Sequence, residues 1–240
     1  AGIPPDIGRK IARALAMVEV ARFVLEIEPV ALGRAIPAGA RPAIVDERRA
    51  RHRRARVDRG LHFLCGDVDV LVEGETGTGK ELVATLLHRW SKRRSRGFVA
   101  INCAALPDAI AEAELFGQET GRNPHARTSR PGRIEAANRG TLFLDELATA
   151  PMLVQEKLLR VIEYGEFERV GGAKPLKVDV RLVCATNEDL PVLAAQGKFR
   201  ADLLDRLAFD VVHLPPLRQR QQDIMLLAQH FAVQMCRELG

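Results

Sequence analysis

Five apolar runs, separated by polar or glycine-rich residues, recur along the chain after residue 65. Runs of about four to eight apolar residues between such breaks are typical of buried strands. We therefore predict strands at Val68–Glu73, Phe98–Asn102, Thr141–Leu144, Val178–Ala185 and Asp210–Leu214.

Amphipathic stretches lie between these runs, with apolar residues three and four positions apart, and this spacing predicts helices. The predicted helices span Glu81–Ser91, Pro151–Glu163 and Asp223–Leu239. Strands that alternate with helices favour an α/β fold, in which helices flank a parallel sheet.

The first 65 residues follow neither pattern. Arg, Ala, Pro and Gly are frequent there, Pro37–Arg56 has no periodicity, and only one weak helix is predicted, within Pro5–Glu28. We therefore expect two parts: an Arg- and Ala-rich, poorly ordered appendage at residues 1–65 and a folded domain at residues 66–240.

The net charge of +5 comes from the appendage. Residues 1–60 contain 13 Lys and Arg against 7 Asp and Glu, whereas residues 61–240 contain 23 against 24. Most of the excess lies in Arg48–Arg59, and such runs are usually solvated, although they can contact phosphate backbones. Nucleic-acid binding through this run is the least favoured function, because charge alone reads no sequence.

Cysteine and hydropathy patterns argue against a metal site, a membrane span and export. The four cysteines are scattered, without a C-x-x-C pair or nearby clustered His, which favours a reduced cytoplasmic protein over a metal-binding one. No apolar run approaches the roughly 18 residues of a membrane span, and charges interrupt the apolar stretch Ile11–Ile27. We therefore expect neither a membrane span nor export.

A loop of the form G-x-x-x-x-G-K connects the first predicted strand to the first predicted helix. Backbone N–H groups and the helix N-terminus in such a loop point at a polyphosphate, and its glycines allow close approach. The flanking strand and helix favour this interpretation over a chance glycine turn. Lys80 would reach the β and γ phosphates. The other predicted nucleotide contacts are Gly74, Glu75, Thr76, Gly77, Thr78, Gly79 and Glu81.

Two carboxylates, Asp145 and Glu146, end the third predicted strand about 65 residues after this loop. Such a pair can divide the work of NTP hydrolysis, with Asp145 organising magnesium and Glu146 polarising the attacking water. Asn187, at the tip of the next strand, is a weaker candidate for sensing the γ phosphate, because Asn ends many strands.

Together, several stretches resemble the central AAA+ domain of bacterial enhancer-binding proteins, which are ATPases that remodel RNA polymerase carrying sigma-54. The stretches are GETGTGKE, NCAALPDAIAEAELFG (Asn102 to Gly117), PGRIEAANRGTLFLDE (Pro131 to Glu146), VQEKLLRVIEYGEFERVGG (Val154 to Gly172) and FRADLLDRLAFDVVHLPPLRQR (Phe199 to Arg220). The resemblance covers about Val68 to Gly240.

This resemblance implies a P-loop NTPase fold of the AAA+ type, with a five-stranded parallel sheet in the order 5-1-4-3-2. It also implies ATP, Mg²⁺ and self-association into a ring, which in this family is a hexamer. Glu81 agrees with this resemblance, since the family normally has glutamate after the loop lysine. Asp145, water and the nucleotide would then hold the magnesium ion.

Three further roles follow from the resemblance. Asn102 matches the residue that holds the catalytic glutamate and releases it according to nucleotide state. Arg200 and Arg206 match arginines donated into a neighbouring subunit's site, and such fingers contribute about 10³–10⁵ in rate. The alternative for both arginines is a surface salt bridge, which contributes at most about 1 kcal/mol.

Two loops, Gly121–Ala126 and Gly165–Gly172, are expected to push on the polymerase, but the first departs from the family. It reads GRNPHA where the family has G-A-F-T-G-A, so Asn123 and Pro124 replace Phe and Thr. This opens a second hypothesis, a regulatory module that binds ATP and assembles without engaging sigma-54.

A third hypothesis is an inactive fragment. The family's helical lid is expected to be absent or truncated, and the helix-turn-helix that binds enhancer DNA has no counterpart in these residues. The Arg-rich start and the altered loop are also compatible with local reading-frame slips.

Overall fold

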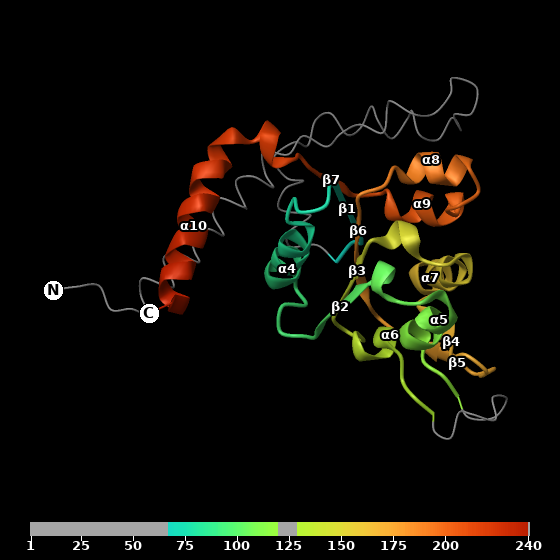
Figure 1. The fold of residues 1–240 in the computed structure, drawn as a ribbon. Helices are drawn as coiled ribbons and strands as arrows, with labels where there is room; N and C mark the ends of the chain where they lie inside the picture. The colour runs from blue at the N-terminus through green and yellow to red at the C-terminus, as the bar shows by residue number, and fades with distance from the viewer. Residues whose placement is uncertain (1–66, 120–128, 240) are drawn as a thin grey trace.

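Five parallel strands form the central sheet, in the order β2–β3–β6–β1–β7 (Figure 1). The computed structural model describes residues 67–119 and 129–239, so the predicted appendage and the Gly121–Ala126 loop lie outside the described residues. Numbered among themselves and read from the other edge, the strands have the order 5-1-4-3-2, which confirms the expected α/β fold. The strands are β1 (Val70–Gly74), β2 (Phe98–Asn102), β3 (Thr141–Asp145), β6 (Arg181–Thr186) and β7 (Val211–Leu214).

Helices cover both faces of this sheet. On one face lies α4 (Lys80–Trp90), and its apolar side chains pack on β1, β3, β6 and β7. The other face carries α5 (Asp108–Phe116), α6 (Arg133–Ala136), α7 (Met152–Tyr164), α8 (Leu190–Ala195) and α9 (Ala201–Leu207). The sheet is therefore the middle layer of three (Figure 1).

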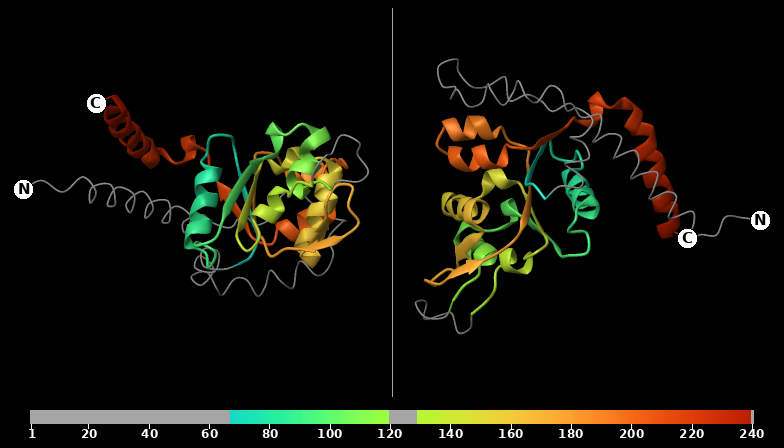
Figure 2. Two further views of the ribbon diagram at one scale, coloured as in Figure 1. Left: turned by 90° about the horizontal axis from the view of Figure 1, so that it is seen from below. Right: turned by 180° about the vertical axis from the view of Figure 1, so that it is seen from behind.

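One long helix, α10 (Gln221–Leu239), leaves this layered core beyond β7 and projects away from it, as Figure 2 shows from two further sides. The remaining elements are short: the 3₁₀ turns η2 (Cys103–Ala105), η3 (Leu147–Thr149) and η4 (Leu217–Gln219), and a hairpin of β4 (Glu166–Glu168) and β5 (Pro175–Lys177). Within the described residues, no helix combines the length and apolarity that a membrane crossing requires.

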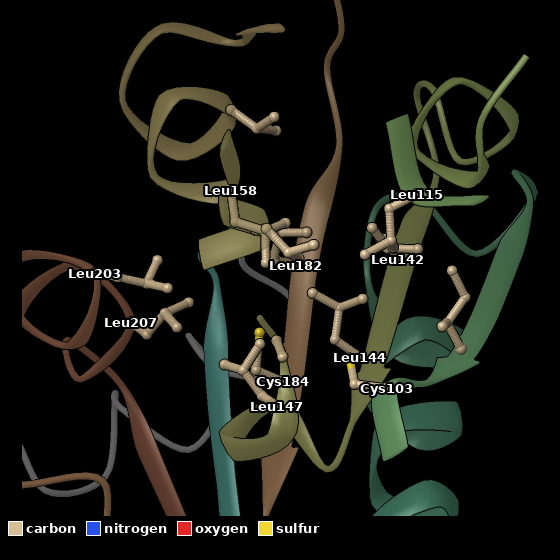
Figure 3. Close-up of a cluster of buried hydrophobic side chains, with 14 of the residues drawn as sticks. Cys103, Leu115, Leu142, Leu144, Leu147, Leu158, Leu182, Cys184, Leu203 and Leu207 are labelled. Carbon is tan, nitrogen blue, oxygen red and sulfur yellow. The ribbon is translucent and has the colours of Figure 1, made fainter. Parts of the chain in front are cut away.

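The alternation of side chains along each strand divides the core between the two faces. In β1, Val70 and Val72 pack with α4, whereas Leu71 belongs to the cluster on the opposite face. Figure 3 shows that second cluster, in which Leu182 of β6 and Leu158 of α7 lie among leucines from β3, α5 and α9. Full burial of one such side chain stabilises the fold by about 1.5–3 kcal/mol.

The predicted fourth strand was wrong at its start. Val178 donates its N–H to the Gly165 carbonyl and Asp179 donates to the Asn138 side chain, so these backbone groups are bonded outside the sheet. The ladder of β6 begins only at Arg181. The other predicted strands and the three predicted helices are present, with ends that differ by at most two residues.

Several elements were not predicted. The helices among them, α5, α6, α8 and α9, are nine residues or shorter. Periodicity needs a window of about 11 residues or more to be recognised, so these helices are too short to show it.

Buried polar groups connect the amino end of β6 to the start of β1 and to α4. The Arg181 guanidinium is fully buried and donates to the carbonyls of Val68, at 2.9 Å, and Leu87, at 3.1 Å. Beside it, the Asp69 carboxylate accepts the Leu182 N–H at 2.7 Å. Burial raises the pKa of Asp69 to about 6, against the opposing effects of that hydrogen bond and of the Arg181 charge.

Candidate nucleotide-binding site

The predicted phosphate-binding loop connects β1 to α4 at the carboxyl edge of the sheet. Gly77 and Gly79 have φ values of 82° and 98°, which L-residues rarely adopt. A Cβ on Gly74 would lie 2.8 Å from the Leu214 carbonyl oxygen. The loop thus depends on glycine both for its turns and for its approach to β7.

Thr78 stabilises the shape of this loop. Its hydroxyl donates to the Glu75 carbonyl at 2.8 Å, and its N–H donates to the same oxygen at 3.2 Å. The first N–H groups of α4 follow directly and have no partner within their helix, as at any helix N-terminus. This arrangement is suited to phosphate oxygens, and Glu81 lies exposed in the same first turn.

Lys80 is buried beneath the loop, with only 6% of its surface exposed. Its ammonium donates to the Gly74 carbonyl at 2.8 Å and to the Glu75 carbonyl at 3.3 Å. The Glu146 carboxylate lies 3.9 Å from the same nitrogen. The structure therefore brings Lys80 and Glu146, two of the predicted site residues, together beside the loop.

Glu146 has an unusual backbone conformation directly after β3. Its φ of 51° and ψ of 45° lie in the left-handed region, which is uncommon for a residue other than glycine. Its N–H donates to the Asp145 carboxylate at 3.1 Å. Strained backbone of this kind often occurs at functional sites, where it directs a side chain.

Asn102 lies beside this pair, because β2 and β3 set Asn102 opposite Asp145. Its side-chain amide donates to the Asp145 carboxylate at 3.4 Å, and its carbonyl oxygen accepts the Ala104 N–H at 2.9 Å. The resemblance led us to expect Glu146 as the partner of Asn102. In this structure Asn102 contacts the Asp145 carboxylate instead.

The charge of both carboxylates affects the adjacent Cys103. Burial, aided by the negative charges of Asp145 and Glu146, raises the pKa of the Cys103 thiol to about 12. Among the described residues, no group of three or more His, Cys, Asp or Glu side chains is arranged to hold a metal ion by itself.

Asn187 and Thr76 join the tip of β6 to the phosphate-binding loop. The Asn187 amide donates to the Thr76 hydroxyl at 3.1 Å. The structure thus sets Asn187 at the loop, where the sequence suggested a group near the γ phosphate.

Two arginines that sequence reasoning missed also contact the loop. Arg218 of η4 binds the Glu75 carboxylate through both terminal nitrogens, and Arg220 donates to the Thr78 carbonyl at 2.8 Å. The available signals were their position after β7, a strand that neighbours β1, and their place in the stretch Phe199–Arg220 that resembles the family.

Arg200 and Arg206 lie elsewhere. Both belong to the α9 region, which packs on the opposite face of the sheet from α4 (Figure 1). Arg200 pairs with Asp202 at 2.7 Å and Arg206 pairs with Glu163 at 2.7 Å. The chain therefore does not bring these arginines to its own phosphate-binding loop.

With this geometry established, comparison with known proteins identifies the family. The family described as the Sigma-54 interaction domain matches residues 48–213. The chain belongs to the sigma-54 interaction domain family. The resemblance seen in the sequence motifs is thereby confirmed.

Individual relatives agree with this assignment. The chain is 65% identical over 178 residues to the Psp operon transcriptional activator of Escherichia coli (strain K12), covering 74% of this chain and 55% of that protein. It also resembles crystal structures of NtrX from Brucella abortus. The complex with ADP has a TM-score of 0.70 and 33% identity, covering 99% of this chain and 48% of that chain. The complex with ATP has a TM-score of 0.67 and 32% identity, covering 95% and 48%. The chain thus spans about half the length of these relatives.

The loop Gly165–Gly172 of this sigma-54 interaction domain contacts the residues that lie directly before and after the segment 120–128. Gln118 and Arg130 form an antiparallel bridge, and the N–H of Glu119 donates to the Val170 carbonyl at 3.0 Å. Arg169 donates to the Ser129 hydroxyl at 2.8 Å. The chain on each side of Gly121–Ala126, which itself lies outside the described residues, is therefore bonded to the second predicted loop.

Proposed function

We propose that this sigma-54 interaction domain hydrolyses ATP and uses the hydrolysis to remodel RNA polymerase carrying sigma-54, in the cytoplasm. The observation that carries the proposal is the convergence of Lys80, Glu146 and Asn187 around the glycine-rich loop at one edge of the sheet. Open α/β sheets bind ligands at the carboxyl ends of their strands. The complexes of the related NtrX with ADP and ATP support a nucleotide as the ligand.

Lys80 would bind the β and γ phosphates. Its ammonium is directed by the carbonyls of Gly74 and Glu75, and phosphate oxygens would take over these two hydrogen bonds. The positive charge then stabilises the charge that develops as the γ phosphoryl group leaves.

Glu146 is the proposed base. A water held by its carboxylate attacks the γ phosphorus, the bond from this phosphorus to the β–γ bridging oxygen breaks, and the proton of the water passes to Glu146. The products are ADP and phosphate. The Glu146 N–H donates to the Asp145 carboxylate and helps to fix it, whereas the Glu146 carboxylate lies near Lys80, and these different contacts suit separate tasks.

The residues present also fit Mg²⁺. Asp145 is the carboxylate that would hold the ion with oxygens of the nucleotide and water, since Glu81 stands where many such loops carry Ser or Thr. When bound, the ion would neutralise charge on the phosphates. Carboxylate oxygen is a ligand type that Mg²⁺ prefers.

Asn102 and Asn187 would report the state of the nucleotide. Asn187 contacts the loop through Thr76, which would set it near the γ phosphate of a nucleotide bound there. Asn102 donates to Asp145 in this structure, and we propose that it exchanges to Glu146 in another nucleotide state, which withdraws the base from water.

Ring assembly, as a hexamer, would complete the site. Arg200 and Arg206 lie in the helix layer opposite α4, and their carboxylate partners are at the surface, so a neighbouring subunit could receive either side chain. Inserted next to the γ phosphate, an arginine stabilises transition-state charge. Enhancer DNA would be bound through a separate domain of the whole protein.

The test is ATP-dependent promoter opening by RNA polymerase carrying sigma-54. We expect the 240-residue chain to support opening and Glu146→Gln to abolish it. If the chain hydrolyses ATP but opens no promoter, the regulatory hypothesis gains support. The double substitution Asn123→Phe with Pro124→Thr, which restores the family's two residues, should then recover opening.

A further inference from the structure

An ion pair joins the phosphate-binding loop to the segment that follows β7. Both terminal nitrogens of Arg218 donate to the two carboxylate oxygens of Glu75, one at 2.8 Å. Bidentate pairs of this kind fix the orientation of both partners as well as their distance. Arg218 lies in η4, so the pair spans from the fifth strand of the sheet to the second residue of the loop.

Without Arg218, the negative charge of Glu75 would oppose the binding of phosphate at this position. It is the acidic residue within a loop that is expected to bind a polyanion, and an unpaired carboxylate there would repel phosphate. In the structure Arg218 neutralises this carboxylate, and the hydrogen bonds from Arg218 lower the pKa of Glu75. The pair is solvent-exposed, so the repulsion that it prevents is screened by salt.

The backbone of Glu75 is equally important for the loop. Its carbonyl oxygen accepts hydrogen bonds from the Thr78 hydroxyl, the Thr78 N–H and the Lys80 ammonium. On the other side of the loop, Arg220 donates to the Thr78 carbonyl at 2.8 Å. The two arginines therefore contact both ends of the turn that Glu75 and Thr78 close.

We propose that Arg218 is a positioning residue for nucleotide binding, which neutralises Glu75 and holds its carboxylate away from the phosphates. Arg220 supports the same turn through the Thr78 carbonyl. The inference rests on the proposed function, because it assigns these side chains to the binding of the ATP phosphates.

Affinity for ATP tests this inference, measured by isothermal titration calorimetry on the full chain. All variants carry Glu146→Gln, so that ATP is not consumed during the titration. We expect Arg218→Ala to weaken ATP binding about threefold to tenfold, a size that suits an exposed charge beside a polyanion. Arg218→Gln, which keeps a polar side chain, should do the same.

Removal of the carboxylate provides the decisive comparison. Adding Glu75→Gln to Arg218→Ala should restore most of the lost affinity, because no carboxylate then needs neutralising. Raising NaCl from about 0.05 M to about 0.5 M should shrink the difference between Arg218→Ala and the parent. Arg237→Ala removes an exposed charge near the far end of α10 and is the matched control, with unchanged affinity expected.

Each other outcome has a definite meaning. Unchanged affinity in Arg218→Ala and Arg218→Gln, or a double variant no tighter than Arg218→Ala, overturns the inference while leaving the proposed function intact. If Lys80→Ala binds ATP as tightly as the parent, the proposed function itself fails. The two failures are therefore distinguishable in one set of titrations.

Discussion

The ammonium nitrogen of Lys80 and a carboxylate oxygen of Glu146 lie 3.9 Å apart, although β6 separates their strands in the sheet. β1 and β3 both pair with β6 in parallel, so they end at the same edge of the sheet. Lys80 follows β1 and Glu146 follows β3. The proposed phosphate-binding group and the proposed base thus lie close together because parallel strands bring their carboxyl ends to one edge.

Replacement of Lys80 should weaken both the binding and the turnover of ATP. Lys80→Ala removes the buried cation that the loop carbonyls direct, and no other lysine contacts the loop among the described residues. We expect kcat/KM for ATP to fall by at least about 100-fold, or about 2.7 kcal/mol. Lys198→Ala removes an exposed lysine and should leave kcat/KM unchanged. A Lys80→Ala variant with ordinary affinity would contradict the assigned role.

Replacement of Glu146 should separate binding from chemistry. Glu146→Gln keeps the shape of the side chain but cannot accept the proton of water, so turnover should fall about 10²–10⁴-fold. ATP binding should persist, which a fluorescent ATP analogue can measure. Glu166→Gln, on β4, is the matched control with normal turnover. Equal loss of binding and turnover in Glu146→Gln would instead indicate a structural role.

The two proposed arginine fingers can be tested by mixing subunits. Arg200→Ala and Arg206→Ala should each lower turnover about 10³-fold, since the finger is lost from every interface. Mixing either variant with Glu146→Gln should recover part of the activity, because an intact arginine and an intact Glu146 then meet at some interfaces.

The mixing experiment excludes a simple folding defect. Failure to recover activity, with both variants folded by circular dichroism, would mean that Arg200 and Arg206 do not act on a neighbouring subunit. Their ion pairs with Asp202 and Glu163 would then be ordinary surface contacts.

Asp69 should make stability depend on pH in a defined direction. Its pKa is about 6 in the folded chain and about 3.9 when unfolded, so the folded state binds more protons between these values. This contribution to stability is present below about pH 4 and is lost as pH rises to about 6.

The comparison with Asp69→Asn isolates that contribution, because Asn can still accept the Leu182 N–H. From pH 4 to pH 7, the free energy of unfolding of the wild type should fall relative to Asp69→Asn by up to about 3 kcal/mol. Urea unfolding at several pH values measures the difference. A difference that is constant with pH would show that Asp69 titrates normally in the fold.

Much of the fold and site could be predicted because the signals are local. Apolar runs such as Thr141–Leu144 indicate buried strands, and the spacing of Gly74, Gly79 and Lys80 identifies the phosphate-binding loop in the sequence itself. The resemblance supplied the strand order, which the structure confirms.

The contacts that could not be predicted depend on tertiary adjacency. Arg218 meets Glu75 only because β7 pairs with β1, and neither residue carries a signal of this in its own segment. Likewise, Asn102 contacts Asp145 through the register of β2 and β3. The left-handed conformation of Glu146 also could not be predicted from the sequence, because residues other than glycine are expected to have negative φ.

The most direct test of a self-assembling ATPase is steady-state ATP hydrolysis per subunit, measured over a wide range of chain concentration. We expect turnover per subunit to rise with concentration, as neighbours complete the sites, and to be lost in Lys80→Ala and Glu146→Gln. Turnover per subunit that is constant with concentration, or that survives in both variants, would contradict a self-assembling ATPase that uses Lys80 and Glu146.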